Sequence, residues 1–324
     1  MAFLNSKSSS YQFQTVNANL KEPWLKKVSI DWKKYWPLYL MALPAILFYL
    51  VWLYGPMWGS LIAFQDFSIR HGFLGSPFVG LDNFVKFFES PFAFRVIRNT
   101  VMINFWNLVF GFTLPIIFAL LLNEIRNKYF KRVVQTITYM PYFIAVIVVA
   151  GLLVNFTSSD GIFSDIIEFF GGTPSNLLAQ PELFRTIFVG SEIWQFLGWN
   201  SIIFLAALAA VNTELYEAAI IDGAGKLKQI YHVTIPGIMP TIVILLILQV
   251  GSIMSLGFEK IILLYNPLTY ETGDVISSFV FRRGIENAEF GFSAAVGFFN
   301  SAVNFAMVII ANRISAKLTE TSLW

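Results

Sequence analysis

The sequence contains little charge and no cysteine. Only 13% of its 324 residues are charged and 56% are hydrophobic, whereas average soluble domains carry about 25% charged residues. So few charged side chains cannot cover a globule with polar surface, so lipid is the expected solvent for much of the chain. The absence of cysteine excludes disulfides and thiolate metal sites.

Histidine and intramembrane acids are also scarce. His71 and His232 stand alone in polar segments without the spacing of metal ligands, so no metal site is expected. Among the acidic residues, only Glu192 falls clearly inside an apolar run. No HExxH, GxSxG or paired intramembrane acids are present, which argues against a membrane-embedded enzyme.

Long apolar runs dominate what is present. A helix needs about 20 residues, at 1.5 Å each, to cross a hydrocarbon core of about 30 Å. We predict an all-α membrane protein whose six transmembrane helices cover residues 36–57, 99–123, 133–157, 185–211, 237–258 and 290–313. Pro44 and Pro115 lie inside the first two runs, and Pro141 is expected to bend the third.

Two shorter segments, residues 80–90 and 162–170, are predicted to be amphipathic surface helices. In the first of them, the expected apolar face is formed by Leu81, Phe84, Val85 and Phe88. Residues 1–35 are polar and rich in lysine, and they hold no apolar core beside a cleavage site. The first span is therefore expected to act as the targeting signal, and residues 1–35 form either a membrane-surface stretch or a disordered tail.

The basic residues are distributed unevenly between the two sides that six spans define. If both termini share a side, that side holds most of the 22 lysines and arginines, with the greatest excess before the first span. Positively charged loops stay in the cytoplasm, and the first helix usually decides the orientation. We therefore expect cytoplasmic termini, which also places residues 212–236 in the cytoplasm.

The most specific pattern in the chain is EAAIIDGAGKLKQIYHVTIP at residues 217–236. It resembles the EAA signature of the coupling loop in permease subunits of binding-protein-dependent, ATP-driven (ABC) importers. The matching positions are Glu217, Ala218, Ala219, Gly223, Ile235 and Pro236. Asp222 and Ala224 flank the glycine and complete the expected ATPase-coupling surface.

Local chemistry predicts how this loop folds. Asn212 is a good N-cap for a helix that runs through Glu217. Gly223 can adopt positive φ and turn the chain into a second short helix, which presents Leu227, Ile230 and Tyr231 on one face and ends at Pro236. Residues 223–228, GAGKLK, lack the G-x4-G-K-[ST] spacing of a nucleotide loop, so this chain is not expected to hydrolyse ATP.

Other segments extend the resemblance to the polysaccharide-type branch of sugar importer permeases, among them GLDNF, IWQFLGWNSIIFLAALAAV and YNPLTYETGDVI. The resemblance implies a type I permease fold. Its parts are a cytoplasmic segment (1–35), a peripheral first helix with an outer loop (36–96), a five-helix core (97–313) and a cytoplasmic tail (314–324). It also implies an oligo- or polysaccharide substrate. The overall similarity is to permeases of alginate oligosaccharide importers, although no residue identifies alginate.

The resemblance implies partners in a bacterial cytoplasmic membrane. They are a second related permease, two ATPase subunits that use ATP and Mg²⁺, and an extracytoplasmic solute-binding protein; nothing indicates nucleic acid or a cofactor bound by this chain. The outer segments 158–184 and 259–289 are the expected docking surface for the binding protein. Arg282 and Arg283 are candidate contacts there, and solvated loop charges are the alternative.

The fourth span is the most polar of the six and predicts part of a substrate pathway. At 100° per residue, Glu192, Gln195 and Trp199 share one face, which we expect to line a lumen. Gly198 and Ser201 lie roughly opposite and are expected to pack against a neighbouring helix. Further candidates for the pathway are Asn155, Asn200, Gln249, Asn300 and Asn304.

Each of these polar residues also has another reading. Hydrogen bonding between helices is the alternative role for the amides. Glu192 would repel an anionic substrate, which argues against direct contact with alginate. The alternative function for the whole chain is an ion-coupled secondary transporter that uses Glu192, although such transporters usually carry several buried ionisable residues and often an inverted repeat.

Overall fold

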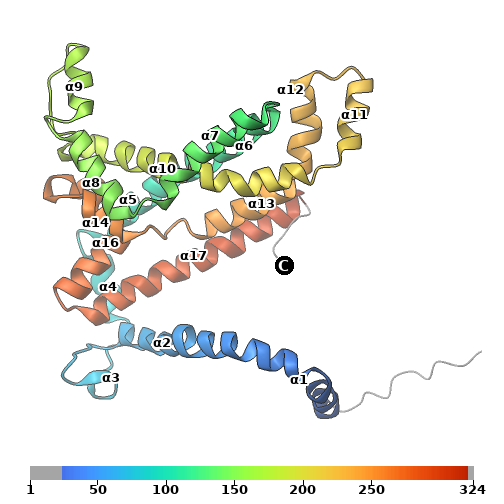
Figure 1. Ribbon diagram of the computed structural model, residues 1–324. Coiled ribbons are helices and arrows are strands. Elements are labelled where there is room, and N and C mark those ends of the chain that lie inside the picture. Colours follow the sequence, from blue (N-terminus) through green and yellow to red (C-terminus); the bar gives the residue numbers. More distant parts are fainter. Residues whose placement is uncertain (1–23, 320–324) are drawn as a thin grey trace, which may run out of the picture. The chain divides into compact units, whose positions relative to one another are not determined.

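The computed structural model describes residues 24–319, with side chains from Lys34 to Lys317 (Figure 1). The predictions for residues 1–23 and for the end of the tail lie outside the described residues. The described chain is almost entirely helical, with one isolated β-bridge between Gln65 and Phe78. Six helical stretches are long and apolar enough to cross a membrane, which confirms the predicted fold class.

The chain divides into two units, residues 1–59 and 60–324. The described part of the first unit is a continuous helical stretch. It consists of α1 (Trp24–Phe48), the π-helical turn η1 (Tyr49–Tyr54) and α2 (Gly55–Met57), and it leads into η2 (Trp58–Phe64). Helix α1 continues through Pro37 and Pro44, as membrane helices can when other groups satisfy the freed carbonyls.

The second unit holds the remaining elements. In chain order they are α3 (Gly72–Gly75), α4 (Asp82–Glu89), α5 (Ala93–Trp106), η3 (Asn107–Phe112), α6 (Thr113–Glu124), α7 (Lys128–Tyr139), η4 (Met140–Phe143), α8 (Val146–Thr157), α9 (Ile162–Phe169), η5 (Leu177–Ala179), α10 (Pro181–Ala209), α11 (Thr213–Ile221), α12 (Lys226–Gln229), η6 (Ile230–Thr234), α13 (Ile235–Gly251), α14 (Phe258–Leu264), η7 (Pro267–Thr269), α15 (Tyr270–Gly273), α16 (Ile276–Phe281), η8 (Arg282–Glu286) and α17 (Phe290–Thr319). Helix α10 is central, because it packs against α6, α7, α13 and α15.

Two apolar clusters lie along α10. Near its beginning, Phe184 and Phe188 are buried with Ile261 of α14. Near its end, Phe204 and Leu208 are buried with Ile238 of α13. Because these clusters fix α10 at both ends, the polar residues between them are held in defined positions.

Helix α4 confirms the predicted helix at residues 80–90, and its predicted apolar face is largely exposed rather than packed against the protein. Its buried residues are Asn83 and Phe87, whereas Leu81, Val85 and Phe88 are exposed. Asn83 Nδ2 donates to the carbonyl oxygens of Ala63 (3.0 Å) and Gln65 (2.9 Å). Ala63 lies near the end of η2 and Gln65 directly follows it, so these two hydrogen bonds hold α4 against the end of η2 through its polar Asn83.

The predicted third span, residues 133–157, is not one helix. Helix α7 ends at Tyr139. The 3₁₀ turn η4, which contains Pro141, follows, and the chain is extended at Ile144 (φ −79°, ψ 127°) before α8 starts. The prediction that Pro141 only bends the helix was therefore wrong. The break frees the carbonyl of Ile144, and Gln195 Nε2 of α10 donates to it at 3.2 Å.

The predicted fifth span also ends early. Helix α13 stops at Gly251, and residues 252–257 are non-helical before α14. Asn304 of α17 satisfies this segment, since its Oδ1 accepts from the backbone N–H of Met254 (2.9 Å) and its Nδ2 donates to Ser255 Oγ (2.7 Å). At its other end this span begins at Lys226, because the helix runs through Pro236 instead of ending there. The turn of η6, in which Ile235 N–H bonds to the carbonyl of Ile230, accommodates the proline.

Close packing of α10 against α7 depends on Gly198. A Cβ atom at Gly198 would lie 2.2 Å from the carbonyl oxygen of Thr138, and Ser201 is fully buried on the same side. The prediction that Gly198 and Ser201 form a packing face is confirmed.

We expect Gly198→Ala to destabilise the folded chain by about 1–3 kcal/mol, because its methyl group meets backbone atoms that cannot rotate away. The measurement is thermal unfolding of the purified protein in detergent. Gly190→Ala is the matched control on the same helix, since a Cβ there meets nothing within 4 Å. Equal unfolding temperatures for the two variants would contradict the packing role of Gly198.

Candidate functional site: a polar cavity, an outer ion cluster and a projecting loop

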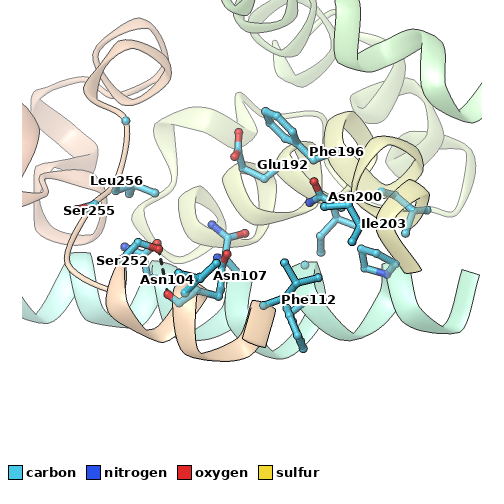
Figure 2. Close-up of a pocket in the computed structure, with 18 of the residues that line it drawn as sticks. Asn104, Asn107, Phe112, Glu192, Phe196, Asn200, Ile203, Ser252, Ser255 and Leu256 are labelled. Atoms are coloured by element: carbon cyan, nitrogen blue, oxygen red, sulfur yellow. Dashed lines mark hydrogen bonds between the residues drawn. The ribbon is translucent and has the colours of Figure 1, made fainter. Parts of the chain in front are cut away.

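A cavity of about 530 Å³ lies between α5–η3–α6, α10, α13 and the non-helical segment 252–257 (Figure 2). Its polar lining residues are Asn104, Asn107, Glu192, Asn200, Gln249, Ser252 and Ser255. The apolar remainder includes Phe112, Phe196 and Phe204. Amides, hydroxyls and aromatic rings in one cavity suit a ligand that carries both hydroxyl groups and apolar ring faces.

The side of α10 that lines this cavity differs from the one predicted. The lining residues of α10 are Glu192, Ile193, Phe196, Leu197, Asn200, Ile203 and Phe204, which form one stripe at helical spacing. The predicted face consisted of Glu192, Gln195 and Trp199. The stripe that lines the cavity is rotated about the helix axis from this face, so the two share only Glu192. Glu192 and Asn200 reach the cavity, whereas Gln195 and Trp199 are absent from its lining.

Gln195 and Trp199 contact neighbouring elements. The side chain of Gln195 is buried and donates to the freed carbonyl of Ile144. Trp199 stacks on Tyr142, with ring centroids 4.1 Å apart and an interplanar angle of 1°. Both residues therefore support the break between α7 and α8.

Of the remaining pathway candidates, some line or support the cavity and others lie away from it. Gln249 lines the cavity, and Asn304 holds the segment whose Ser252 and Ser255 line it. Asn155 is exposed on α8. Asn300 lies one turn before Asn304, and within the described part of the chain its buried Oδ1 has no hydrogen-bond partner.

Glu192 forms an ion pair that the sequence did not indicate. Lys260 Nζ of α14 lies 2.7 Å from Glu192 Oε1 and 3.4 Å from Gln195 Oε1. The lysine side chain is only 5% exposed, whereas that of Glu192 is 25% exposed. From the sequence, Lys260 is an outer-loop charge, because it follows the fifth apolar run and no local pattern connects it with an acid 68 positions earlier.

Asn104 and Asn107 are cavity residues that the sequence analysis overlooked. They lie three positions apart in the second span, where α5 passes into the π-helical turn η3. Two asparagines at helical spacing in an apolar helix were the available signal. In Figure 2 they project from α5–η3 opposite the α10 residues Glu192 and Asn200.

A second charged cluster lies in the outer segments. Asp274 is fully buried, and its Oδ2 lies 2.7 Å from Arg282 Nη2 and 3.3 Å from Arg95 Nη2. Asn99 Nδ2 donates to the Asp274 carbonyl at 2.9 Å. The cluster therefore connects α5 to the segment that joins α15 and α16. Arg283 pairs instead with Glu289 at 2.7 Å, nearer the surface.

The titration behaviour of this cluster follows from its contacts. Burial works against the charge of Arg282, but the hydrogen bond and the negative charge of Asp274 raise its pKa above the ordinary value. Burial raises the pKa of the Tyr265 hydroxyl to about 12, although the positive charge of Arg282 works against this shift. At neutral pH Tyr265 is therefore a neutral phenol whose oxygen accepts from Arg282 Nη1 at 3.0 Å.

The EAA loop projects as two short helices, α11 and α12, joined by a tight turn (Figure 1). Asn212 Oδ1 accepts from the backbone N–H of Glu214, which confirms the predicted N-cap. Gly223 has φ +76°, as predicted. Gly223 N–H bonds to the Ile220 carbonyl and Ala224 N–H to the Ala219 carbonyl, the two bonds of a Schellman turn.

Further contacts fix α11 against the helix that follows it. Tyr216 Oη donates to Thr234 Oγ1 at 3.0 Å, and Lys226 Nζ lies 3.0 Å from Glu124 Oε2 at the end of α6. Glu217 lines a pocket of about 450 Å³ between these elements. The exposed residues of the loop include Glu217, Ala218, Asp222 and Pro236, whereas Ala219, Ala224 and Ile235 are half-buried. The loop therefore presents a small surface on which the apolar side chains of Ile221 and Leu227 are exposed.

Comparison with known proteins identifies the family. Residues 111–320 match the family described as "Binding-protein-dependent transport system inner membrane component". The chain belongs to this family. It is therefore a multi-pass permease component of the bacterial inner membrane, as the resemblance predicted, and its six apolar helices agree with this location.

Two comparisons add detail about relatives. The chain is 42% identical over 288 residues to the polygalacturonan/rhamnogalacturonan transport system permease protein YteP of Bacillus subtilis (strain 168), covering 89% of this chain and 90% of YteP. It also resembles a chain in a crystal structure of a bacterial alginate ABC transporter in complex with an alginate pentasaccharide-bound periplasmic protein. That chain is 41% identical with a TM-score of 0.84, over 90% of this chain and 98% of the other.

A second crystal structure, of a bacterial ABC transporter involved in the import of the acidic polysaccharide alginate, gives the same result. Its matching chain is 41% identical with a TM-score of 0.84, over 90% of this chain and 99% of the other. About nine-tenths of this chain therefore shares its fold with permease chains of bacterial alginate transporters.

We expect Asp274→Asn to lower the free energy of unfolding by about 2–3 kcal/mol, because the partly exposed Arg95 and Arg282 would both lose the buried carboxylate that accepts their charged hydrogen bonds. Thermal unfolding in detergent measures this change. Glu289→Gln is the control, since it removes the acid of a more exposed pair, which contributes about 0–1 kcal/mol. A cost for Asp274→Asn as small as that for Glu289→Gln would show that the cluster does not stabilise the outer segments.

Proposed function

We propose that this chain is one of two permease subunits of an ATP-driven importer for acidic oligosaccharides. The single observation that carries this proposal is its similarity, at 41–42% identity and over about nine-tenths of each chain, to permeases named for polygalacturonan/rhamnogalacturonan and for alginate. Galacturonan and alginate are both chains of uronic acids. The polar cavity supports the same substrate class, because its amides and hydroxyls match sugar hydroxyl groups.

The cavity serves as this subunit's share of the translocation pathway. Its walls come from α5–η3–α6, α10 and α13, and a second, related permease completes the passage on its open side. Within the pathway, Asn104, Asn107, Asn200 and Gln249 bind sugar hydroxyls. Gln195 and Asn304 hold the broken helices that shape the wall, and Trp199 supports the first break by stacking on Tyr142. Asn155 and Asn300 lie outside the cavity lining.

The EAA loop couples this pathway to ATP hydrolysis in two separate ATPase subunits. Only the non-helical residues 210–212 separate α10 from α11, so a displacement of α11 is transmitted to the cavity wall through this short connection. Ala218 offers little bulk, and Ile221 and Leu227 expose apolar surface that an ATPase cleft can bury. Both termini and this loop lie on the cytoplasmic side, as the basic residues indicate.

The outer segments 158–184 and 259–289 form the docking surface for the solute-binding protein. The charge of Arg282 is already held by buried Asp274, whereas Arg283 is more exposed. Arg283 is therefore the better placed of the two arginines to contact a partner. Arg282 acts indirectly by holding this surface in shape.

The ion-coupled alternative receives less support from the geometry. A carboxylate that carries coupling protons or cations must gain and lose them during the cycle. Glu192 already has a lysine at 2.7 Å as its counter-ion. A fixed internal pair is better suited to shaping the pathway than to relaying ions.

We expect a soluble ATPase and a second permease to co-purify with the tagged chain after mild detergent extraction from its native membrane. Mass spectrometry of the purified complex identifies them, with a tagged unrelated membrane protein as the control. Reproducible purification of this chain alone would contradict the importer assignment.

We expect Gly223→Pro to insert into the membrane but to lose the ATP hydrolysis that the binding protein stimulates. Proline fixes φ near −65°, whereas the Schellman turn requires the observed +76°. Gly225→Ala is the control, because Gly225 has φ −68° and open space around a Cβ. Normal stimulation in Gly223→Pro would exclude this turn from coupling.

A further inference from the structure

The ion pair between Glu192 and Lys260 has an unusual arrangement at the cavity. Of the described residues that line the cavity, Glu192 is the one that carries a charge. Lys260 lies behind it, outside the lining, with its ammonium 2.7 Å from the carboxylate and 5.6 Å from the ring centre of Phe188. The cavity is therefore exposed to a carboxylate, while the compensating charge is buried in the wall.

Stability alone does not account for this pair. Replacing a buried ion pair by packed apolar residues is often neutral or stabilising, because both charges must give up their hydration. Besides Glu192, the lysine ammonium lies near Gln195 Oε1 (3.4 Å) and the ring of Phe188, which belongs to a buried apolar cluster. The position of the pair at the cavity wall points to a role in what passes through the cavity.

The charge of the wall matters most for an acidic substrate. Without Lys260, the carboxylate of Glu192 would repel every uronate that enters. Two unit charges about 10 Å apart at an effective dielectric constant of about 20 repel by an energy equivalent to roughly a tenfold change in rate. Lys260 is too deeply buried, at 5% exposure, to bind a sugar carboxylate itself. It can cancel the repulsion without trapping the substrate.

We propose that Lys260 determines the charge selectivity of the pathway: it neutralises Glu192 and so admits acidic oligosaccharides to the cavity. This inference rests on the proposed function, since it requires a substrate that carries carboxylates. It adds a selectivity-determining residue that lies outside the cavity lining. It also removes the difficulty that Glu192 alone would present to an anionic sugar.

The test uses the complete importer with its own binding protein, reconstituted in proteoliposomes, and two probes that differ only in charge. One probe is a short oligogalacturonate, and the other is the same oligosaccharide with its carboxylates methyl-esterified. Initial import rates of each variant are divided by the wild-type rate for the same probe, which removes any preference of the binding protein. Size-exclusion profiles in detergent confirm that each variant is folded.

The variants distinguish the effect of the Lys260 charge on import from its effect on folding and packing. In Lys260→Gln, import of the acid probe is expected to fall about tenfold relative to the ester. Lys260→Arg should retain the wild-type ratio, and Glu192→Gln should not lower it, because that change removes the repelling charge. The double variant Glu192→Gln/Lys260→Gln restores a neutral wall and is expected to return the ratio to the wild-type value.

Several outcomes would overturn the inference. Equal losses for both probes in Lys260→Gln, or no recovery in the double variant, would assign Lys260 a packing role only, with the proposed function intact. If wild type imports the acid but not its ester, acid import alone is compared: its recovery in the double variant would support the charge role of Lys260, and its continued loss would assign a packing role. Import of neither probe by wild type would contradict the proposed substrate class and this inference with it.

Discussion

The structure depends on satisfying backbone hydrogen-bonding groups wherever a membrane helix breaks. Lipid offers no partners for free N–H and C=O groups, so broken helices persist only where other protein groups supply them. Gln195 bonds the freed carbonyl of Ile144, and Asn304 bonds the N–H of Met254. These two amides allow α7–α8 and α13–α14 to be discontinuous. The second discontinuity, residues 252–257, forms part of the cavity wall. The hydrogen bonds of Asn304 stabilise this non-helical segment and so help to shape the cavity.

Charges inside the second unit follow a similar constraint. Asp274 is buried with Arg95 and Arg282, and the buried Lys260 pairs with Glu192. The first cluster holds α5 to the outer segments, which are the proposed docking surface. The second lies at the wall of the cavity, where its charge would act on the acidic substrate that we propose. Each buried charge thus has a counter-ion from a distant part of the chain, which connects the outer segments to the transmembrane helices.

Helix α10 relates the three parts of the proposed mechanism. Its beginning packs with α14 and α15, its middle lines the cavity, and its end leads into α11 of the EAA loop. The close contact at Gly198 holds α10 to α7, and the Schellman turn at Gly223 sets the direction of the loop. The proposed coupling therefore runs from the loop to the cavity through α10 and the short connection at residues 210–212.

By itself, the sequence determined the features that depend on local chemistry. Hydrophobic runs predicted six spans, Asn212 and Gly223 predicted the cap and the turn of the EAA loop, and the spacing of that loop predicted the family. Only the tertiary structure decided which face of α10 lines the cavity, because helix breaks elsewhere require Gln195 as a donor. It also decided that Lys260 pairs with Glu192, since partners 68 residues apart are brought together by packing that no local pattern encodes.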